Sequence, residues 1–109
     1  MDLKFQVLLL DDVDKFLATL DKKTREKVLY NLWKSSMIND SELFKKITDE
    51  IWEFRTLFQG KQIRLLAFWD KTSKQPKIVV CTHGFVKKEW KVPKQEIEKA
   101  IGIMKEYYK

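Results

Sequence analysis

The sequence is poor in several residue types, and each shortage argues against a class of protein. Its 109 residues include one cysteine, Cys81, and one histidine, His83, which argues against an internal disulfide and a four-ligand Cys/His zinc site. No apolar run approaches the roughly 18 residues that a membrane span needs. The N-terminus also lacks a basic leader followed by a long apolar region and a small-residue cleavage site. We therefore expect a cytoplasmic protein without a membrane anchor, a metal or a cofactor.

The sequence does contain enough apolar material for one core. With 44% apolar and 35% charged side chains, its 109 residues suffice for one core and are too few for two. We therefore expect a single domain over residues 1–109, without repeats, low-complexity segments or a linker.

The basic residues are unevenly distributed along the chain. Residues 1–60 hold 10 Lys and Arg against 11 Asp and Glu, whereas residues 61–109 hold 12 against 5. The excess in the second half favours a polyanionic partner such as a nucleic acid. A lysine-rich solvated surface is the alternative that charge alone leaves open.

The N-terminal residues predict a strand followed by a helix. Residues 4–10 form an apolar run that is typical of a strand. Apolar residues then recur at i, i+3, i+4 and i+7, as on one side of a helix; they are Val13, Phe16, Leu17 and Leu20. The carboxylates of Asp11, Asp12 and Asp14 should satisfy free N–H groups at the start of this helix and favour the positive end of its dipole. A metal site is the alternative, but no second acidic cluster accompanies them.

A second helix should follow directly. Asp21 is a suitable N-cap for it, and its buried side is expected to comprise Val28, Leu29, Leu32 and Trp33. Two short helices joined by a tight turn predict an antiparallel helical hairpin. Residues 39–47 are more polar and predict a turn or a single helical turn.

The central sequence predicts a β-hairpin. Residues 51–58 and 61–68 alternate about Gln59 and Gly60, and glycine supplies the positive φ that a tight hairpin turn requires. A two-residue turn puts one set of side chains on a single face, which should pack on the helices; the set is Trp52, Phe54, Thr56, Phe58, Lys61, Ile63, Leu65 and Ala67.

The opposite face of this hairpin places Arg55 directly across from Arg64. Pair terms at such positions amount to about 0.2–1 kcal/mol, and like charges are destabilising. We therefore expect an anion near the two arginines. The alternative is a solvated pair that Glu53 screens.

The rest of the chain predicts one more strand and a terminal helix. Residues 77–82 are apolar on both faces, as in a strand inside a sheet, and His83 and Gly84 should end it. Pro93 suits the first turn of a last helix, whose buried stripe should comprise Ile97, Ala100, Ile101, Met104 and Tyr108. The predicted order is β-α-α-β-β-β-α, an α/β fold of the α+β type.

Four segments in order, WEFR, IRLLAFW, HGFVKKEWKVP and EIEKA, resemble the phage-derived Gp49-like or HigB branch of the RelE/ParE toxin superfamily. The match covers about residues 43–105. It implies a small curved, mainly antiparallel sheet with two helices on one face and RNA on the open face. It also implies a type II toxin that cleaves messenger RNA without a metal and acts on translated mRNA at the ribosome. The implied partners are mRNA, the ribosome and a cognate antitoxin, typically a helix-turn-helix protein.

The same resemblance assigns roles to Arg55, Arg64, His83, Lys87 and Lys88. Metal-free cleavage needs the 2′-hydroxyl deprotonated, the charge on the phosphate stabilised and the leaving 5′-oxygen protonated. Arginine suits the second task, because its planar fork binds two phosphate oxygens and keeps its charge. Arg55 and Arg64 are therefore our candidates for phosphate binding.

Two residues are candidates for proton transfer. Histidine, with an unperturbed pKa of about 6.5, suits acid and base work at neutral pH, which favours His83. The alternative for His83 is a hydrogen-bonded structural role. Lys87 is the second candidate, because Lys88, Lys91 and the arginines would lower its pKa. The alternative for Lys87 and its neighbouring lysines is that they only bind backbone phosphates and transfer no proton. Unlike the better-known RelE pattern, this chain has no tyrosine after its last strand, so acid and base are not assigned.

Further RNA contacts are expected from residues that precede and follow the hairpin in the sequence. Trp90 lies among Lys88 and Lys91, and an aromatic interleaved with basic residues suits base stacking. Trp90 alternatively anchors the terminal helix. Lys45 and Lys46 either extend the groove or face solvent. The other tryptophans, Trp33, Trp52 and Trp69, are expected in the core, and Cys81 is expected to be a small buried residue.

Two other functions are compatible with the same fold. A ParE-like toxin inhibits DNA gyrase, but the presence of Arg55, Arg64, His83 and the lysine pair argues against it. A non-catalytic nucleic-acid-binding module is the second alternative, and the sequence leaves it open.

Overall fold

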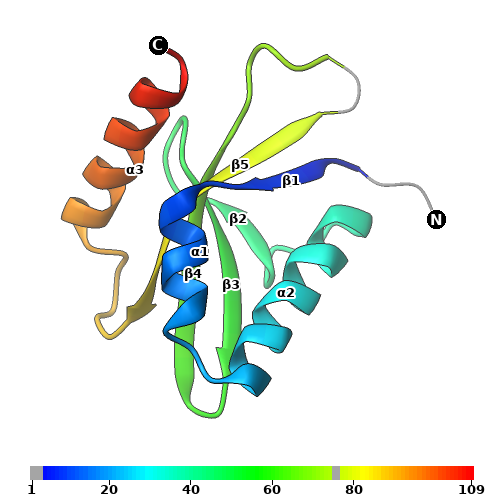
Figure 1. Ribbon diagram of the computed structural model, residues 1–109, viewed down its shortest axis with the longest axis vertical. Coiled ribbons are helices and arrows are strands. Elements are labelled where there is room, and N and C mark those ends of the chain that lie inside the picture. Colours follow the sequence, from blue (N-terminus) through cyan, green and yellow to red (C-terminus); the bar gives the residue numbers. More distant parts are fainter. Residues whose placement is uncertain (1–3, 75–76) are drawn as a thin grey trace.

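A mixed five-stranded sheet lies at the centre of the structure (Figure 1). The computed structural model describes residues 4–74 and 77–109. In chain order the elements are β1 (Gln6–Leu9), α1 (Asp11–Ala18), α2 (Lys22–Met37), β2 (Phe44–Lys46), β3 (Trp52–Phe58), β4 (Lys61–Trp69), β5 (Ile78–Lys87) and α3 (Lys94–Tyr107). This is an α+β fold, as the sequence predicted. No helix of the described residues is long and apolar enough to cross a membrane.

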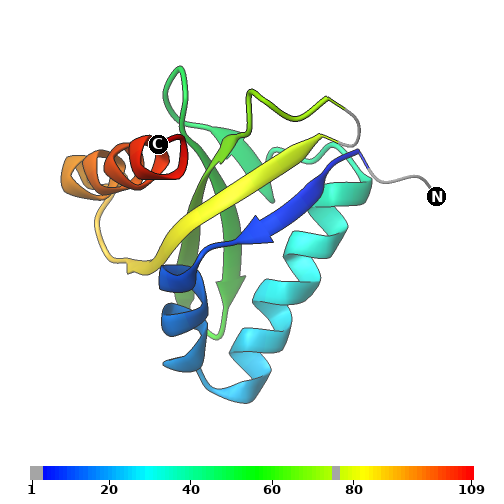
Figure 2. The ribbon, with the colours of Figure 1, turned by 45° about the horizontal axis from the view of Figure 1, so that its top comes forward.

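The strands lie side by side in the order β1-β5-β4-β3-β2. β1 runs parallel to β5 and the other neighbours are antiparallel, so the sheet is mainly antiparallel, as expected. It is open, with β1 and β2 as its two edge strands. Helices pack on both faces, and the sheet therefore does not wrap around a single helical layer (Figure 2).

The β3–β4 hairpin has the predicted register. Phe58 pairs with Lys61 at the turn, and Arg55 pairs with Arg64 in the middle of the strands. Gln59 and Gly60 both have positive φ, of 50° and 76°. Such a turn matches the twist of the flanking strands, which is why this short local pattern sets the register of the whole hairpin.

The prediction of a turn or a single helical turn over residues 39–47 is correct for residues 41–43, which form a turn, and wrong for Phe44–Lys46, which form β2. Phe44 pairs with Phe54 of β3, and their ring centroids are 4.3 Å apart in a stacked arrangement. The Phe44 ring also stacks on Trp52 at 4.8 Å. These cross-strand aromatic contacts stabilise a three-residue edge strand that is too short to show an alternating pattern in the sequence.

β5 corrects a second prediction, because His83 and Gly84 lie inside the strand and do not end it. Gly84 pairs with Leu65 and continues the ladder to Lys87. A Cβ atom at Gly84 would clash with the Phe16 ring of α1 and lie 2.6 Å from Leu65 Cδ2. The glycine therefore permits close packing of α1 on the sheet, and it is not a turn residue.

The two N-terminal helices pack on the face of the sheet where the sequence placed them. The buried cluster there is Phe5, Val13, Leu17, Val28, Leu32, Phe54, Ile63, Leu65, Ala67, Val79 and Cys81. Inside it, Asn31 Nδ2 of α2 donates to Thr56 Oγ1 of β3 over 3.0 Å. Cys81 is fully buried, as predicted, and burial raises the pKa of its thiol.

The helix starts differ from each other. Asp21 caps α2 as predicted, since its Oδ2 accepts a hydrogen bond from Thr24 N over 3.3 Å. The N-cap of α1 is Leu10, which makes no side-chain cap bond, and the predicted carboxylates lie within the first helical turn; they are Asp11, Asp12 and Asp14. These carboxylates do not cap α1, and they favour it through the helix dipole.

The predicted buried side of α2 is correct for two residues and wrong for two. Val28 and Leu32 are buried, whereas Leu29 is 41% exposed and Trp33 is 56% exposed. One helix cannot bury such a wide apolar surface against one side of a sheet, and so Leu29 and Trp33 face away from it.

The terminal helix α3 packs on the other face, and the sheet separates it from α1 and α2 (Figure 2). Ala100 and Met104 are buried there, as predicted, against Leu66, Phe68 and Val80. Tyr108 is 37% exposed, while Tyr107 packs in the cluster. The sheet thus carries two apolar clusters where one core was expected. The face that the resemblance left open is partly covered by α3.

Candidate functional site

Arg55 and Arg64 lie on a strongly cationic part of the sheet, on the same side as α3. Alternate residues of a strand share a face, so the register assigns the neighbours of the two arginines. On this face lie Lys45 of β2, Glu53, Arg55 and Leu57 of β3, Gln62 and Arg64 of β4, and Phe85 and Lys87 of β5. We call this set the cationic face. It brings together Arg55, Arg64, Lys87 and Lys45, which four different strands supply.

Arg64 is buried in the cationic face. Its side chain is 3% exposed, and its Nε lies 2.9 Å from Oε1 of Glu53, which is 10% exposed. The N–H is not aimed at that oxygen, so the contact is an ion pair without an aligned hydrogen bond. Arg64 also donates to Gln62 Oε1 over 3.1 Å. Burial lowers the pKa of Arg64, and the charge of Glu53 opposes that shift. The solvated-pair alternative is therefore wrong for Arg64.

Arg55 is held less firmly than Arg64. Its one side-chain hydrogen bond among the described residues is a long one, from a guanidinium nitrogen to Ser41 O over 3.5 Å. Its Nε is buried and has no hydrogen-bond partner in residues 4–74 and 77–109. A buried donor without a partner costs about 1–3 kcal/mol. Beside it is a hollow lined by Glu42, Arg55, Leu57, Gln62 and Arg64. An anion in this hollow would satisfy the free donor.

Lys87 has the lowered pKa that the sequence predicted, but with partly different causes. Burial lowers the pKa of Lys87 most, followed by the charges of Arg64, Arg55 and Lys45, while Glu53 raises it. The arginines were expected to act on Lys87. Lys45 acts on it in place of the predicted Lys88 and Lys91, because the sheet brings β2, β3 and β4 to this end of β5.

A second hollow extends the cationic face toward α3. Its lining includes Lys45, Lys46, Glu53, Lys87 and Lys91. Lys46 alternates to the other face of β2 but still reaches this hollow at the sheet edge. The structure therefore groups four of the predicted lysines around one depression, with Glu53 as its acidic member.

Lys88 and Trp90 lie in the segment between β5 and α3 and are exposed. Trp90 is 90% exposed, so the alternative in which it anchors the terminal helix is wrong. Neither residue lines the hollow around Lys87. An exposed indole beside lysines remains accessible to a ligand.

His83 lies apart from these cations, beneath α3. It is 2% exposed, and on this face Phe85 lies between it and Lys87, with its ring stacked on the imidazole at 6.0 Å. His83 Nε2 is 3.1 Å from Glu96 Oε1, and Nδ1 is 3.0 Å from Thr82 Oγ1. Burial lowers the pKa of His83, and the hydrogen bond to Glu96 opposes the shift. A neutral ring satisfies both contacts if Nε2–H donates to Glu96 and Nδ1 accepts from Thr82.

Sequence reasoning missed the central position of Glu53. It named this carboxylate only as a screen for a solvated arginine pair, whereas Glu53 is a buried partner of Arg64 that also acts on Lys87. The available signal was the period of the strand, which puts Glu53 on the same face as Arg55. The burial of that face depends on the neighbouring strands of the assembled sheet and could not be read from the hairpin.

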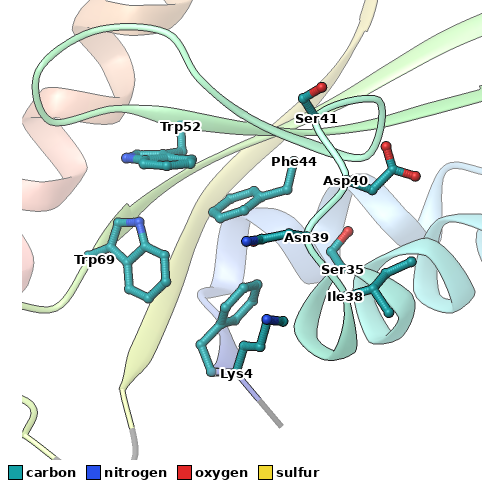
Figure 3. Close-up of a pocket in the computed structure, with 10 residues that line it drawn as sticks. Lys4, Ser35, Ile38, Asn39, Asp40, Ser41, Phe44, Trp52 and Trp69 are labelled. Atoms are coloured by element: carbon teal, nitrogen blue, oxygen red, sulfur yellow. The ribbon is translucent and has the colours of Figure 1, made fainter.

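An aromatic hollow lies on the side of the sheet that carries α1 and α2, opposite the cationic face. Figure 3 shows this hollow. It is lined by Lys4, Phe5, Ser35, Ile38, Asn39, Asp40, Ser41, Phe44, Trp52 and Trp69. Trp52 and Trp69 are half-buried and meet edge to face at 5.9 Å. The prediction that they lie in the core is therefore correct only in part, since they pack against the core and also border this hollow.

The fold and the cationic face define a class, namely a small α+β protein with a surface suited to a polyanion. In residues 4–74 and 77–109, no group of three or more His, Cys, Asp or Glu side chains could hold a metal ion. The chain matches the family described as Phage derived protein Gp49-like (DUF891) over residues 15–105. It belongs to this family, which is part of the RelE/HigB-like group related to toxin–antitoxin systems. No curated protein matches the chain.

Proposed function

We propose that this protein is the toxin of a type II toxin–antitoxin system and a metal-independent endoribonuclease that cleaves mRNA at the ribosome. The family membership supports the toxin assignment. The observation that carries the nuclease assignment is the cationic face, in which Arg55 keeps a buried, unpaired Nε among the described residues beside the fixed Arg64. Paired guanidinium groups can bind the non-bridging oxygens of a phosphate and stabilise the charge that develops on it.

In this mechanism the two arginines have different roles. Arg64, held by Glu53, is a preorganised positive charge, and Arg55 donates to the phosphate. Lys87 transfers a proton, since its lowered pKa makes the ammonium a better acid and the free amine more accessible as a base. The bond from the 2′-oxygen to phosphorus forms as the bond to the 5′-oxygen breaks. The free amine of Lys87 takes the proton of the 2′-hydroxyl, and the 5′-oxygen takes a proton from water or from a second side chain.

His83 remains a candidate for the second proton transfer, with a restriction that follows from its position. Its ring nitrogens both contact other side chains, and α3 covers it. Its contact with substrate would require α3 to move. We therefore favour Lys87 for proton transfer, with His83 supporting the strand on which Lys87 lies.

The remaining basic residues are proposed to hold the RNA backbone. They are Lys45, Lys46, Lys88 and Lys91, with Trp90 as a stacking platform for one base. A helix-turn-helix antitoxin would neutralise the toxin in the cytoplasm. A gyrase inhibitor would use the fold without needing the Arg55, Arg64 and Lys87 group, and a non-catalytic nucleic-acid-binding module would need this group only to hold phosphates.

Mapping RNA 5′ ends after incubation with translating ribosomes tests the proposal. New ends within open reading frames are expected, and purified RNA should still be cleaved in EDTA. Loss of cleavage in EDTA that Mg²⁺ restores would contradict the metal-independent mechanism. Inhibition of DNA supercoiling without new RNA ends would instead support the gyrase alternative, and RNA binding without new ends the non-catalytic one.

A further inference from the structure

The outer surface of α2 carries an apolar stripe that is about half exposed. Leu29, Tyr30 and Trp33 are 41%, 50% and 56% exposed. Residues three and four apart are neighbours on a helix, so these three form one patch, on the side of α2 opposite Val28. The rings of Tyr30 and Trp33 contact each other, with centroids 5.8 Å apart. We call these three residues the α2 stripe.

Such a patch is typical of a protein interface. Single exposed apolar residues are common, but contiguous exposed patches mark sites of association. Tryptophan and tyrosine are also the residues that contribute most binding energy in interfaces. The sequence pattern of α2 predicts that Leu29 and Trp33 are buried, but they do not pack against the sheet and remain exposed. A partner that covers them would explain why this helix has two apolar sides.

The charges around the stripe indicate the chemistry of the partner. α2 contains five basic side chains and one acidic one. Lys23, Lys27 and Lys34 follow one another at helical spacing along one flank, and Lys27 Nζ lies 5.2 Å from the centroid of the Tyr30 ring. Within the described residues, none of these three lysines forms an ion pair with a carboxylate. They are available to carboxylates from outside the chain.

We propose that the α2 stripe docks a segment of a partner protein that presents apolar side chains beside a row of carboxylates. Under the proposed function that partner is the antitoxin, and in this respect the inference rests on that function. The apolar side chains would cover Leu29, Tyr30 and Trp33, and the carboxylates would meet the lysine flank. An amphipathic acidic helix satisfies both requirements, since its apolar and acidic rows would lie side by side.

Two other occupants fit the surface less well. A second copy of this chain would bring together two helices with the same excess of basic side chains, and like charges across an interface are unfavourable. RNA would find the lysines, but Leu29 offers a base no stacking surface and Lys27 already covers the Tyr30 ring. An acidic protein segment uses both the apolar and the basic residues.

The position of the stripe separates partner binding from RNA cleavage. α1 and α2 lie on one side of the sheet and α3 on the other (Figure 2). The strand register puts the cationic face on the α3 side, opposite the α2 stripe. Changes in the stripe should therefore weaken the complex without altering the activity of the free protein. A failure of this inference can thus be distinguished from a failure of the proposed function, which the cleavage assay alone decides.

The test measures binding, by titration calorimetry, of a synthetic amphipathic helical peptide in which a row of leucines lies beside a row of glutamates. We expect Trp33→Ser and Leu29→Ser each to weaken binding by at least about tenfold, as for interface residues that contribute strongly. Leu8→Ser is the matched control, because Leu8 of β1 has the same 41% exposure as Leu29. It should change the affinity by less than about twofold. Circular dichroism of each variant verifies the fold.

A charge reversal tests the second half of the proposal. Lys27→Glu should weaken the complex and reduce its dependence on salt, whereas Lys105→Glu on the exposed side of α3 should not. All variants should cleave RNA like the parent. Equal effects of stripe and control variants, or no binding at all, would overturn the inference. It would also be overturned if Trp33→Ser abolished a homodimer in sedimentation, or if Lys27→Glu weakened RNA binding.

Discussion

Glu53 contacts Arg64 but not Arg55, although the two arginines lie directly across from each other on β3 and β4. The pair is therefore asymmetric. One guanidinium is neutralised and held inside the sheet, and the other keeps a buried donor without a partner among the described residues. This asymmetry separates the effects of replacing each arginine.

Replacing Arg55 should affect activity more than stability. Arg55→Gln removes a repulsive charge and an unpaired donor, so the free energy of unfolding should stay within about 0.5 kcal/mol of the parent or rise. Cleavage should fall by roughly two to three orders of magnitude, as for the loss of one contact to the transition state. Urea unfolding and single-turnover cleavage measure the two effects. Unchanged cleavage would remove Arg55 from the site, and Lys105→Gln controls for the loss of one charge.

Replacing Arg64 should affect both quantities. Arg64→Gln leaves the Glu53 carboxylate buried without its partner, and breaking such a pair costs roughly 3 kcal/mol. Cleavage should also fall, because the preorganised charge is lost. The double variant Glu53→Gln/Arg64→Gln should regain part of the stability and none of the activity. A double variant as unstable as Arg64→Gln would show that the ion pair is not the cause.

Glu53→Gln should shift the pH dependence of cleavage. The charge of Glu53 raises the pKa of Lys87 against the other influences, so its removal lowers that pKa further. The part of the pH–rate profile that reports Lys87 should move to lower pH. Glu42→Gln is the matched control, since Glu42 lines the neighbouring hollow but is not among the charges that act on Lys87. If both variants keep the parent profile, Lys87 does not carry the proton transfer.

His83 should make the protein less stable in mild acid. Its folded-state pKa is lowered by burial, so below the unfolded value of about 6.5 the unfolded chain binds a proton that the folded protein does not. Stability should therefore fall as the pH falls from about 7 to about 5. The difference between the parent and His83→Gln isolates this contribution from those of nearby Glu96 and Asp12. Parallel stability curves for the two proteins would contradict it.

RNA binding should weaken steeply with salt. Each phosphate contact displaces counterions and contributes a slope of about −0.7 to the logarithmic plot for single strands. With a substrate blocked at the 2′-oxygen, Lys45→Gln and Lys91→Gln should each reduce the slope by roughly this amount. A flat curve for the parent would exclude the cationic face as a phosphate-binding surface. Lys105→Gln should keep the parent slope.

The sequence by itself determined the features that depend on short-range chemistry. Asp21 predicts the start of α2, because a carboxylate bonds the free N–H groups of the first turn. Gln59 and Gly60 predict the register that places Arg55 opposite Arg64, because a two-residue turn leaves one pairing possible. In each case the interacting groups lie within a few residues or are joined by one tight turn.

Only the tertiary structure decided which of these surfaces are covered. The packing of α3 on the sheet buries His83 against Glu96. The assembled strands hold Glu53 and Arg64 together as an ion pair away from solvent. The sheet similarly selects one apolar side of α2 and leaves Trp33 exposed. An apolar pattern shows that a side chain can be buried. Which residues are buried depends on which distant element packs on the limited area of a sheet face. No local pattern in this chain determines that choice.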